Sequence, residues 1–224
     1  SGAVCIVCCS DRAEPRPCPR CGFRLCPSCS TPSSPRSWSP ALDSPQPPPA
    51  AHPPDECAAL ARIGNTTDMF NLVLPVRFAL LRSRDGDMFE WLLQYMDHNK
   101  ERAVRHKKMA VSTARMAKIV AGAVSGLGCE LSLRIIGILF TNCFEFSSYS
   151  LQARALYPLV SLINHSCIPN LRHTNLIKEM RSHDLEGEIV VMQLDAQRTV
   201  LPGAQLNIRY NHYTQVTFRD EGFF

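Results

Sequence analysis

Hydrophobic residues recur at helical spacing through the middle of the chain. Between Asp55 and about Ala123, four stretches place apolar side chains three or four positions apart, which predicts amphipathic helices. A kink is expected at Pro75, an N-cap at Thr67 and an interhelical turn at Asp85-Gly86-Asp87. The four stretches are ECAALARI, TDMFNLVLPVRFALLRSR, GDMFEWLLQYMDHNKERAVRHKK and AVSTARMAKIVAGAV.

After Gly128 the pattern changes to short apolar runs rich in Ile, Val and Leu, separated by Gly, Pro, Asn and Asp. Such runs predict β-strands, and the chain as a whole is expected to have an α+β fold. No internal repeat is found. The predicted strands are LRIIGILF, LYPLVSLI, GEIVVMQL, QRTVL and AQLNIRY.

The beginning of the chain differs from the rest in amino-acid composition. Residues 30–54 are dominated by Pro and Ser, which predicts an extended, solvated insertion. The predicted organisation is a cysteine-rich module over 1–57 that contains this insertion, a helical region over 58–128 and a β-rich part over 129–224.

Composition and charge exclude some functions. The chain is 45% hydrophobic and 20% charged, as in ordinary globular proteins, and no apolar run is long enough to span a bilayer. A net charge of +4 is too small for a dedicated nucleic-acid binder, so nucleic-acid binding is expected to be weak or absent. The run HNKERAVRHKK over 98–108 predicts either a solvated helix face or a basic patch for acidic protein tails or nucleic acid.

Cysteine spacing predicts two zinc sites. The Cys-x-x-Cys pairs let two thiolates reach one ion, and repeated pairs without a preceding apolar leader favour zinc in a reducing compartment. Spacing alone leaves open which pairs share an ion, and free thiols or a solvated loop histidine are the alternatives. The eight predicted ligands are Cys5, Cys8, Cys18, Cys21, Cys26, Cys29, His52 and Cys57.

The run CIVCC...CPRCGFRLC..C followed by H...DEC resembles the MYND zinc finger. The resemblance implies one ion held by the first and third cysteine pairs and a second held by Cys18, Cys21, His52 and Cys57. It also implies binding of proline-containing peptides from partner proteins.

The segment SLINHSCIPN is similar to the signature of the SET domain of protein lysine methyltransferases. GILFTNCFEF, ALYP and LPGAQLNIRYN extend the similarity, and the order of finger, helices and signature resembles the SET and MYND domain-containing family. The resemblance implies a pseudoknot-like threading, S-adenosylmethionine as cofactor, a protein lysine as substrate, two structural zinc ions, and residence in the nucleus or cytoplasm.

The resemblance implies roles for individual residues. Tyr210 corresponds to the active-site tyrosine and Tyr157 to a residue of the lysine channel, for which a half-buried strand aromatic is the alternative. Asn164 is alternatively a turn residue. Methyl transfer requires a neutral lysine amine, which a dry aromatic channel favours. The implied cofactor contacts are Asn142, Ser161, Ile163, Asn164, His165 and Phe224.

Two family features do not occur in these 224 residues. They are a Gly-x-Gly cofactor turn ahead of the finger and a cysteine cluster that joins the signature cysteine, here Cys167, at a third zinc. We therefore expect weak cofactor binding and a buried free thiol at Cys167, as in a fragment or a noncatalytic relative. The alternative function is a MYND/SET adaptor that binds protein partners in transcriptional regulation.

Overall fold

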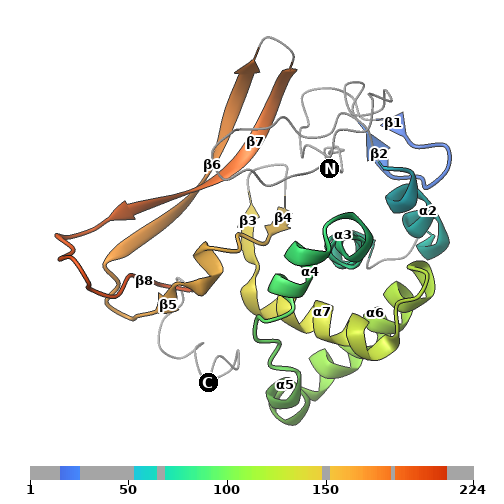
Figure 1. The fold of residues 1–224 in the computed structure, drawn as a ribbon, viewed down its shortest axis with the longest axis horizontal. Coiled ribbons are helices and arrows are strands. Elements are labelled where there is room, and N and C mark those ends of the chain that lie inside the picture. Colours follow the sequence, from blue (N-terminus) through green and yellow to red (C-terminus); the bar gives the residue numbers. More distant parts are fainter. Residues whose placement is uncertain (1–15, 26–52, 65–68, 148–151, 183–184, 211–224) are drawn as a thin grey trace.

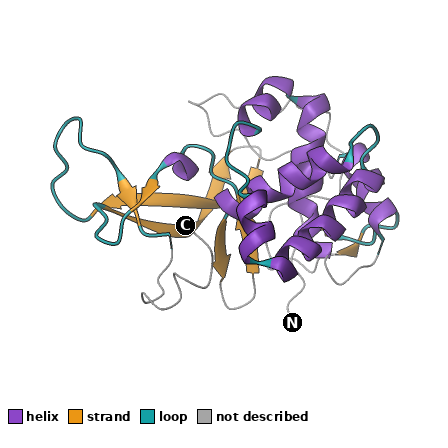
Figure 2. Ribbon diagram, turned by 90° about the horizontal axis from the view of Figure 1, so that it is seen from below, coloured by secondary structure: helices purple, strands orange, loops and turns teal. Residues whose placement is uncertain are grey.

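The computed structural model is mixed helix and strand, as the α+β prediction requires. It describes residues 16–25, 53–64, 69–147, 152–182 and 185–210. Within these ranges the helices gather on one side of the molecule together with the short β1 and β2, and the other strands lie on the opposite side (Figures 1 and 2). No helix among the described residues is both long and apolar enough to cross a bilayer.

The helical side contains six α-helices in the described ranges. They are α2 (Pro54–Ile63), α3 (Met69–Arg84), α4 (Gly86–Leu92), α5 (Asn99–Arg105), α6 (Lys107–Ala123) and α7 (Cys129–Asn142). The helical layer was predicted correctly, but the stretch expected to be helical from Gly86 to Lys108 divides into α4, α5 and the start of α6. α3 continues through Pro75. Asp85 caps α4, because its carboxylate accepts a hydrogen bond of 3.0 Å from the Met88 N–H. Thr67 lies outside the described residues.

One hydrophobic core joins α2, α3, α4, α6 and α7. Phe78 and Phe89 meet edge to face within it, with ring centroids 5.9 Å apart. Cys21 and Phe23 from the cysteine-rich module belong to the same buried cluster. The most deeply buried apolar side chains are Leu60, Leu72, Val76, Phe89, Val120, Ile135, Ile136 and Ile138.

The strand predicted at LRIIGILF is wrong, because these residues form the middle of α7. Ile135, Ile136 and Ile138 are all buried, so the apolar side chains of this run do not mark a single helix face. A short, fully buried apolar run has no periodicity that separates a strand from a helix. Packing against α3 and α6 decides in favour of the helix.

The strands form four two-stranded sheets within the described ranges. β1 (Arg16–Pro17) pairs with β2 (Arg24–Leu25), and β3 (Phe144–Ser147) pairs with β4 (Gln152–Ala155). The longest pair is the antiparallel hairpin of β6 (Leu171–Ser182) and β7 (Leu185–Ala196). β5 (Asn164–His165) and β8 (Asn207–Ile208) pair in parallel.

Two further strand predictions are wrong, and two are confirmed at least in part. LYPLVSLI forms turns and the 3-10 helix η1 (Val160–Leu162), since Pro158 cannot donate to a sheet ladder. QRTVL forms bends and no strand. GEIVVMQL lies within β7, and AQLNIRY contains the short β8.

Candidate functional site

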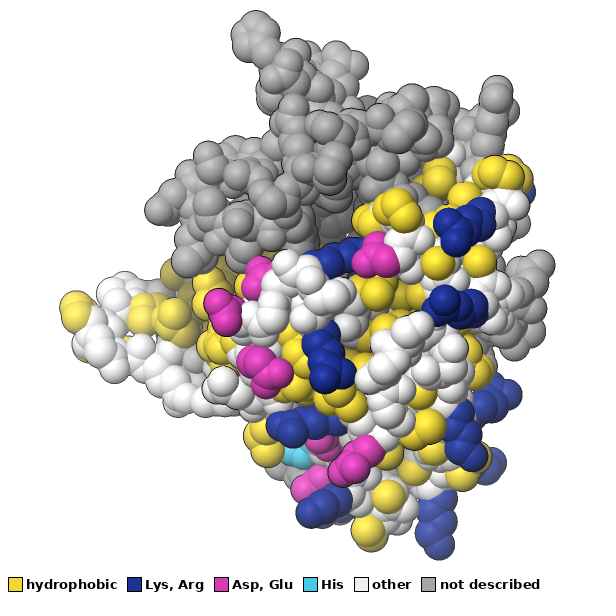
Figure 3. Space-filling view, turned by 45° about the vertical axis from the view of Figure 1, so that its right-hand side comes forward, with side chains coloured by type: hydrophobic (Ala, Val, Ile, Leu, Met, Phe, Trp, Pro, Cys, Tyr) yellow, Lys and Arg dark blue, Asp and Glu magenta, His cyan; other side chains and the backbone are white. Residues whose placement is uncertain are grey.

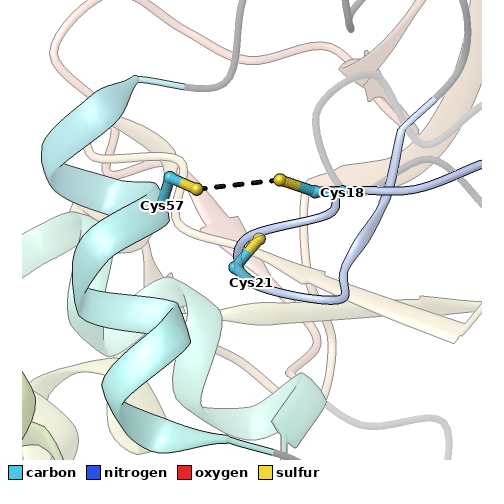
Figure 4. A group of neighbouring side chains, drawn as sticks. All are labelled: Cys18, Cys21 and Cys57. Carbon is cyan, nitrogen blue, oxygen red and sulfur yellow. Dashed lines mark hydrogen bonds between the residues drawn. The ribbon is translucent and has the colours of Figure 1, made fainter.

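Three predicted zinc ligands meet where the cysteine-rich module contacts α2 (Figure 4). Cys18 and Cys21 lie in the turn between β1 and β2, and Cys57 lies in the first half of α2. All three sulfur atoms are within 4.8 Å of one another, and the Cys18 and Cys57 sulfurs are 3.7 Å apart. Residues 39 positions apart in sequence therefore form one thiol cluster.

The turn that presents two of these thiols follows from its sequence. The Cys18 N–H donates to the Phe23 carbonyl at 2.7 Å, and the Gly22 N–H donates to the Cys18 carbonyl at 2.8 Å. Gly22 has a φ of 76°, in the left-handed region where a Cβ is unfavourable. Glycine directly after the second cysteine therefore lets the chain fold back so that both sulfurs face α2.

The local electrostatics distinguish one sulfur from the other two. Burial raises the pKa of the Cys18 thiol, but hydrogen bonds from the backbone N–H groups of Cys21 and Arg20 outweigh burial and bring it to about 7. Burial raises the pKa of Cys21 to about 12 and also raises that of Cys57. Without a cation, the cluster therefore holds one thiolate most readily, at Cys18.

The cluster could hold a metal ion, and its sulfur spacing is compatible with zinc. In a tetrahedral site with zinc–sulfur bonds of about 2.3 Å, two sulfur ligands lie about 3.8 Å apart, close to the separation of the Cys18 and Cys57 sulfurs. A divalent cation would also stabilise the second and third thiolates that burial disfavours. The remaining predicted ligands lie outside the described residues; they are Cys5, Cys8, Cys26, Cys29 and His52.

A partly buried ion pair holds α2 in place beside the thiol cluster. Glu56 precedes Cys57 in sequence and is only 3% exposed. The Arg77 guanidinium of α3 donates to its carboxylate at 2.9 Å from Nε and lies 2.9 Å away at Nη2. Because Glu56 is buried, losing the partly exposed Arg77 would leave its carboxylate uncompensated, so this contact holds α2 against α3.

A second group of predicted residues meets at the parallel pair of β5 and β8. Asn164 pairs with Asn207 and His165 with Ile208, and the Ser166 N–H donates to the Ile208 carbonyl at 3.0 Å. This pairing brings the NHSCIPN segment beside the strand that leads to Tyr210.

Tyr210 is held by three contacts. Its hydroxyl donates to the Ile163 carbonyl at 2.8 Å, and its N–H donates to His165 Nδ1 at 3.2 Å. The two rings are tilted against each other with centroids 5.3 Å apart. Burial, followed by the charge of Arg209, lowers the pKa of His165, which favours the neutral ring that Nδ1 needs in order to accept.

Three other predicted residues lie where α7 meets the η1 segment. Both Asn142 side-chain hydrogens go to backbone carbonyls, at 2.9 Å to Met96 in the loop before α5 and 2.8 Å to Ile138 in α7. The Ser161 hydroxyl lies 2.8 Å from the Asn142 carbonyl and 2.9 Å from the Tyr157 carbonyl. Tyr157 is half-buried and packs against Phe144, with centroids 6.1 Å apart. Phe224 lies outside the described residues.

Asn170, which the sequence suggested only as part of a turn, connects the segments of the second group by hydrogen bonds. Asn170 is 7% exposed, and its side chain donates to the Gln205 carbonyl at 2.8 Å while accepting from the Asn207 N–H at 2.8 Å. Its carbonyl accepts from the Gln197 N–H at 2.9 Å. An asparagine that follows proline at the end of a polar segment was the only signal for this role.

The prediction for Cys167 is wrong, because its side chain is exposed. Its sulfur lies 3.5 Å from His165 Nε2, the ring nitrogen that carries the hydrogen when Nδ1 accepts. The turn into Ile168 and Pro169 faces solvent, with Ile168 74% exposed, so no apolar packing covers the thiol.

Comparisons with known proteins leave the family open. A scan against models of protein families finds no match to this chain, and a search of curated proteins also finds none.

Proposed function

We propose that this chain is an S-adenosylmethionine-dependent protein-lysine N-methyltransferase built from a MYND-type zinc finger and a SET-type core. The parallel pairing of β5 and β8 carries the proposal, because it sets Tyr210 against His165 and Ile163. These are residues that the sequence resemblance assigns to one active site. A pseudoknot-like threading of the NHSCIPN segment is part of the proposal.

The free polar groups near this pairing suit the amino acid end of the cofactor. Asn142 Oδ1 accepts no hydrogen bond from a described residue, and the Asn164 side chain is exposed and makes none within the same ranges. An ammonium group requires an acceptor such as Asn142 Oδ1, and a carboxylate requires a donor such as the Asn164 amide. S-adenosylmethionine, when bound, supplies an activated methyl group on a sulfonium.

Tyr210 is proposed to orient the substrate amine. Its hydroxyl hydrogen is committed to the Ile163 carbonyl, so the oxygen retains lone pairs that can accept from a neutral amine. Burial raises the pKa of Tyr210, which keeps the hydroxyl protonated at neutral pH. His165 acts through the Tyr210 backbone and is a positioning residue.

The thiol cluster has a structural part in this proposal. Zinc bound by Cys18, Cys21 and Cys57 would tie the finger to α2, whose apolar face lies in the core of the helical side. Binding of proline-containing peptides is proposed for the finger, and a histone or nonhistone lysine for the SET-type site.

Calorimetry with S-adenosylmethionine tests the first step. We expect weak binding that Asn164→Ala weakens about tenfold, a loss of about 1.4 kcal/mol, because an amide donor to a carboxylate is lost. Asn71→Ala, at an exposed asparagine of α3, is the matched control and should bind like the unaltered chain. No binding by the unaltered chain, or equal binding by both variants, would sink the assignment.

Transfer of a labelled methyl group tests the second step. Histones and a lysine-containing nonhistone protein serve as acceptors, and Tyr210→Phe should reduce transfer at least about a hundredfold while leaving cofactor affinity unchanged. A Tyr210→Phe variant as active as the unaltered chain would show that the hydroxyl has no catalytic role.

A noncatalytic adaptor is the second candidate. This candidate is favoured because several of the proposed site groups already form hydrogen bonds within the protein. Both Asn142 side-chain hydrogens, the Tyr210 hydroxyl hydrogen and both His165 ring nitrogens have such partners. In that case the chain binds protein partners without binding S-adenosylmethionine, an outcome that the calorimetry separates from the first candidate.

A further inference from the structure

The positive charge of the chain is concentrated on α5 and α6. The whole sequence has 24 basic and 20 acidic residues, yet Glu101 is the only acidic residue between Asn99 and Ala123. We call the exposed face formed by α5 and α6 the basic surface, and Figure 3 shows a cluster of Lys and Arg side chains along the lower right of the view. Its cations are Lys100, Arg105, Lys107, Lys108, Arg115 and Lys118, all exposed.

The cations of this surface alternate with exposed apolar side chains. Val104 is 76% exposed, Val111 71% and Met109 45%. Along α6, Lys108, Val111, Arg115 and Lys118 follow at intervals of three or four and therefore share one helix face. The opposite face of α6 is already used, since Met116, Ala117, Val120 and Ala123 are buried in the core.

Within the described residues, five of these six cations have no neutralising carboxylate. Lys100, Arg105, Lys107, Lys108 and Lys118 form no ion pair with a described carboxylate. Lys107 and Lys108 also stand in the first turn of α6, where the helix dipole disfavours cations, and that turn contains no acidic residue. A solvated helix face typically carries charges of both signs, whereas the stretch 99–123 has one acidic residue among its cations.

A hollow lies at the corner between the two helices. It has a volume of about 500 Å³ and is lined by residues 104–109. His106 is part of this lining, and its Nε2 is buried without a hydrogen-bond partner among the described residues. Because the chain itself covers that nitrogen, a molecule in the hollow meets the exposed Val104 and Met109 and the cations of the lining instead.

We propose that the basic surface binds an acidic segment of a partner protein in which Asp or Glu side chains alternate with apolar ones. The cations meet the carboxylates, while Val104, Met109 and Val111 meet the apolar side chains. α6 has 17 residues and is about 25 Å long, so about eight residues of an extended peptide match its length.

Two other anionic partners fit less well. Between Asn99 and Ala123 the sequence has no Phe, Trp or Tyr on which nucleic-acid bases could stack. A membrane surface is met by a helix with a broad face of Leu, Phe or Trp, whereas the broad apolar face of α6 is buried. The proposal does not depend on the methyltransferase assignment.

Fluorescence anisotropy with a labelled peptide of about ten residues, alternating Glu and Leu, tests the proposal. The double variant Lys107→Glu, Lys108→Glu should lower the affinity about tenfold or more, and raising NaCl from about 50 mM to about 0.5 M should weaken binding to the unaltered chain. Glutamate in the first turn suits the helix dipole, so circular dichroism should show an unchanged fold.

The matched control reverses two charges elsewhere. Arg172→Glu, Arg198→Glu changes the net charge equally, at exposed positions on β6 and after β7, and should leave peptide affinity within about twofold. Equal affinity of the two double variants would overturn the proposal. So would tighter binding of duplex DNA, or of phosphatidylserine vesicles, that is lost in the Lys107→Glu, Lys108→Glu variant, since the surface would then belong to that other class of partner.

Discussion

Gly137 in the middle of α7 offers a sharp test of how the basic surface is anchored. A Cβ at this position would lie 2.5 Å from both Asn99 Nδ2 and Asn99 Oδ1, far inside normal contact distance. Asn99 begins α5, donates to the Leu133 carbonyl at 3.1 Å and accepts from Arg102 Nη1 at 2.9 Å. Gly137→Ala therefore forces the Asn99 side chain out of its place.

The expected magnitude follows from these contacts. Losing the amide hydrogen bond costs about 1 kcal/mol and losing the bond to the guanidinium about 1.5 to 3 kcal/mol. Replacing glycine by alanine inside a helix stabilises the helix by about 1 kcal/mol, because alanine has the higher helix propensity. Gly137→Ala should therefore lower the free energy of unfolding by about 1.5 to 3 kcal/mol, or the melting temperature by roughly 3 to 12 °C.

Gly122 in α6 is the matched control, because an added Cβ there meets no atom within 4 Å. Gly122→Ala should raise the free energy of unfolding by about 0.5 to 1 kcal/mol. Both variants are compared by urea denaturation followed by circular dichroism. In an Asn99→Ala background, where the obstruction is gone, Gly137→Ala should become stabilising. Stabilisation by Gly137→Ala in the unaltered background would refute the reasoning.

Three further predictions concern the finger and the η1 segment. Cys18→Ser should lower the zinc content by about one equivalent and reduce the melting temperature of the helical side, because Cys21 and Cys57 belong to its core; unchanged zinc by mass spectrometry would contradict this. Gly22→Ala should cost about 1 kcal/mol of backbone strain at a φ of 76° and weaken zinc affinity about fivefold, measured by competition with a chelator; unchanged affinity would disprove the role of the turn. Burial raises the pKa of Tyr95, whose hydroxyl donates to the Pro158 carbonyl at 2.6 Å; its stabilising contribution is present below the unfolded pKa of about 10 and is lost as pH rises toward the higher folded pKa. Tyr95→Phe should lower the free energy of unfolding by about 1 kcal/mol at neutral pH and remove the loss of stability at alkaline pH, as measured by thermal melts. An identical loss of stability at alkaline pH in both proteins would contradict this prediction.

Sequence patterns predicted the helical side well but misplaced its last helix. Amphipathic spacing is local information, and it identified α2 and α6 because each has one buried and one exposed face. α7 is buried around Ile135, Ile136 and Ile138, so only its neighbours in space distinguish it from a strand. β6 went unpredicted because LRHTNLIKEMRS is largely polar and gains its order from pairing with β7.

The candidate site was predictable where the chemistry depends on residue type. Cys-x-x-Cys spacing predicted that Cys18 and Cys21 share an ion, and the MYND resemblance added Cys57, which the structure places beside them. The anchoring of Tyr210 by His165, and of both segments by Asn170, depends on contacts between distant parts of the chain. Such contacts leave no periodic or spacing signal in a single sequence.

The place of the β6–β7 hairpin in the chain sets an order of folding events. About 40 residues separate β5 from β8, and the hairpin lies between them with Leu171 opposite Ala196. Closing the hairpin first shortens the loop that β5 and β8 must close from about 41 residues to about 16, which saves about 0.8 kcal/mol of chain entropy. Tyr210 and His165 therefore come together late, after the local contacts are made. In pulse-labelling hydrogen exchange, the Ser166 amide, which is bonded to the Ile208 carbonyl, should gain protection after the amides of the hairpin, and earlier protection would exclude this order.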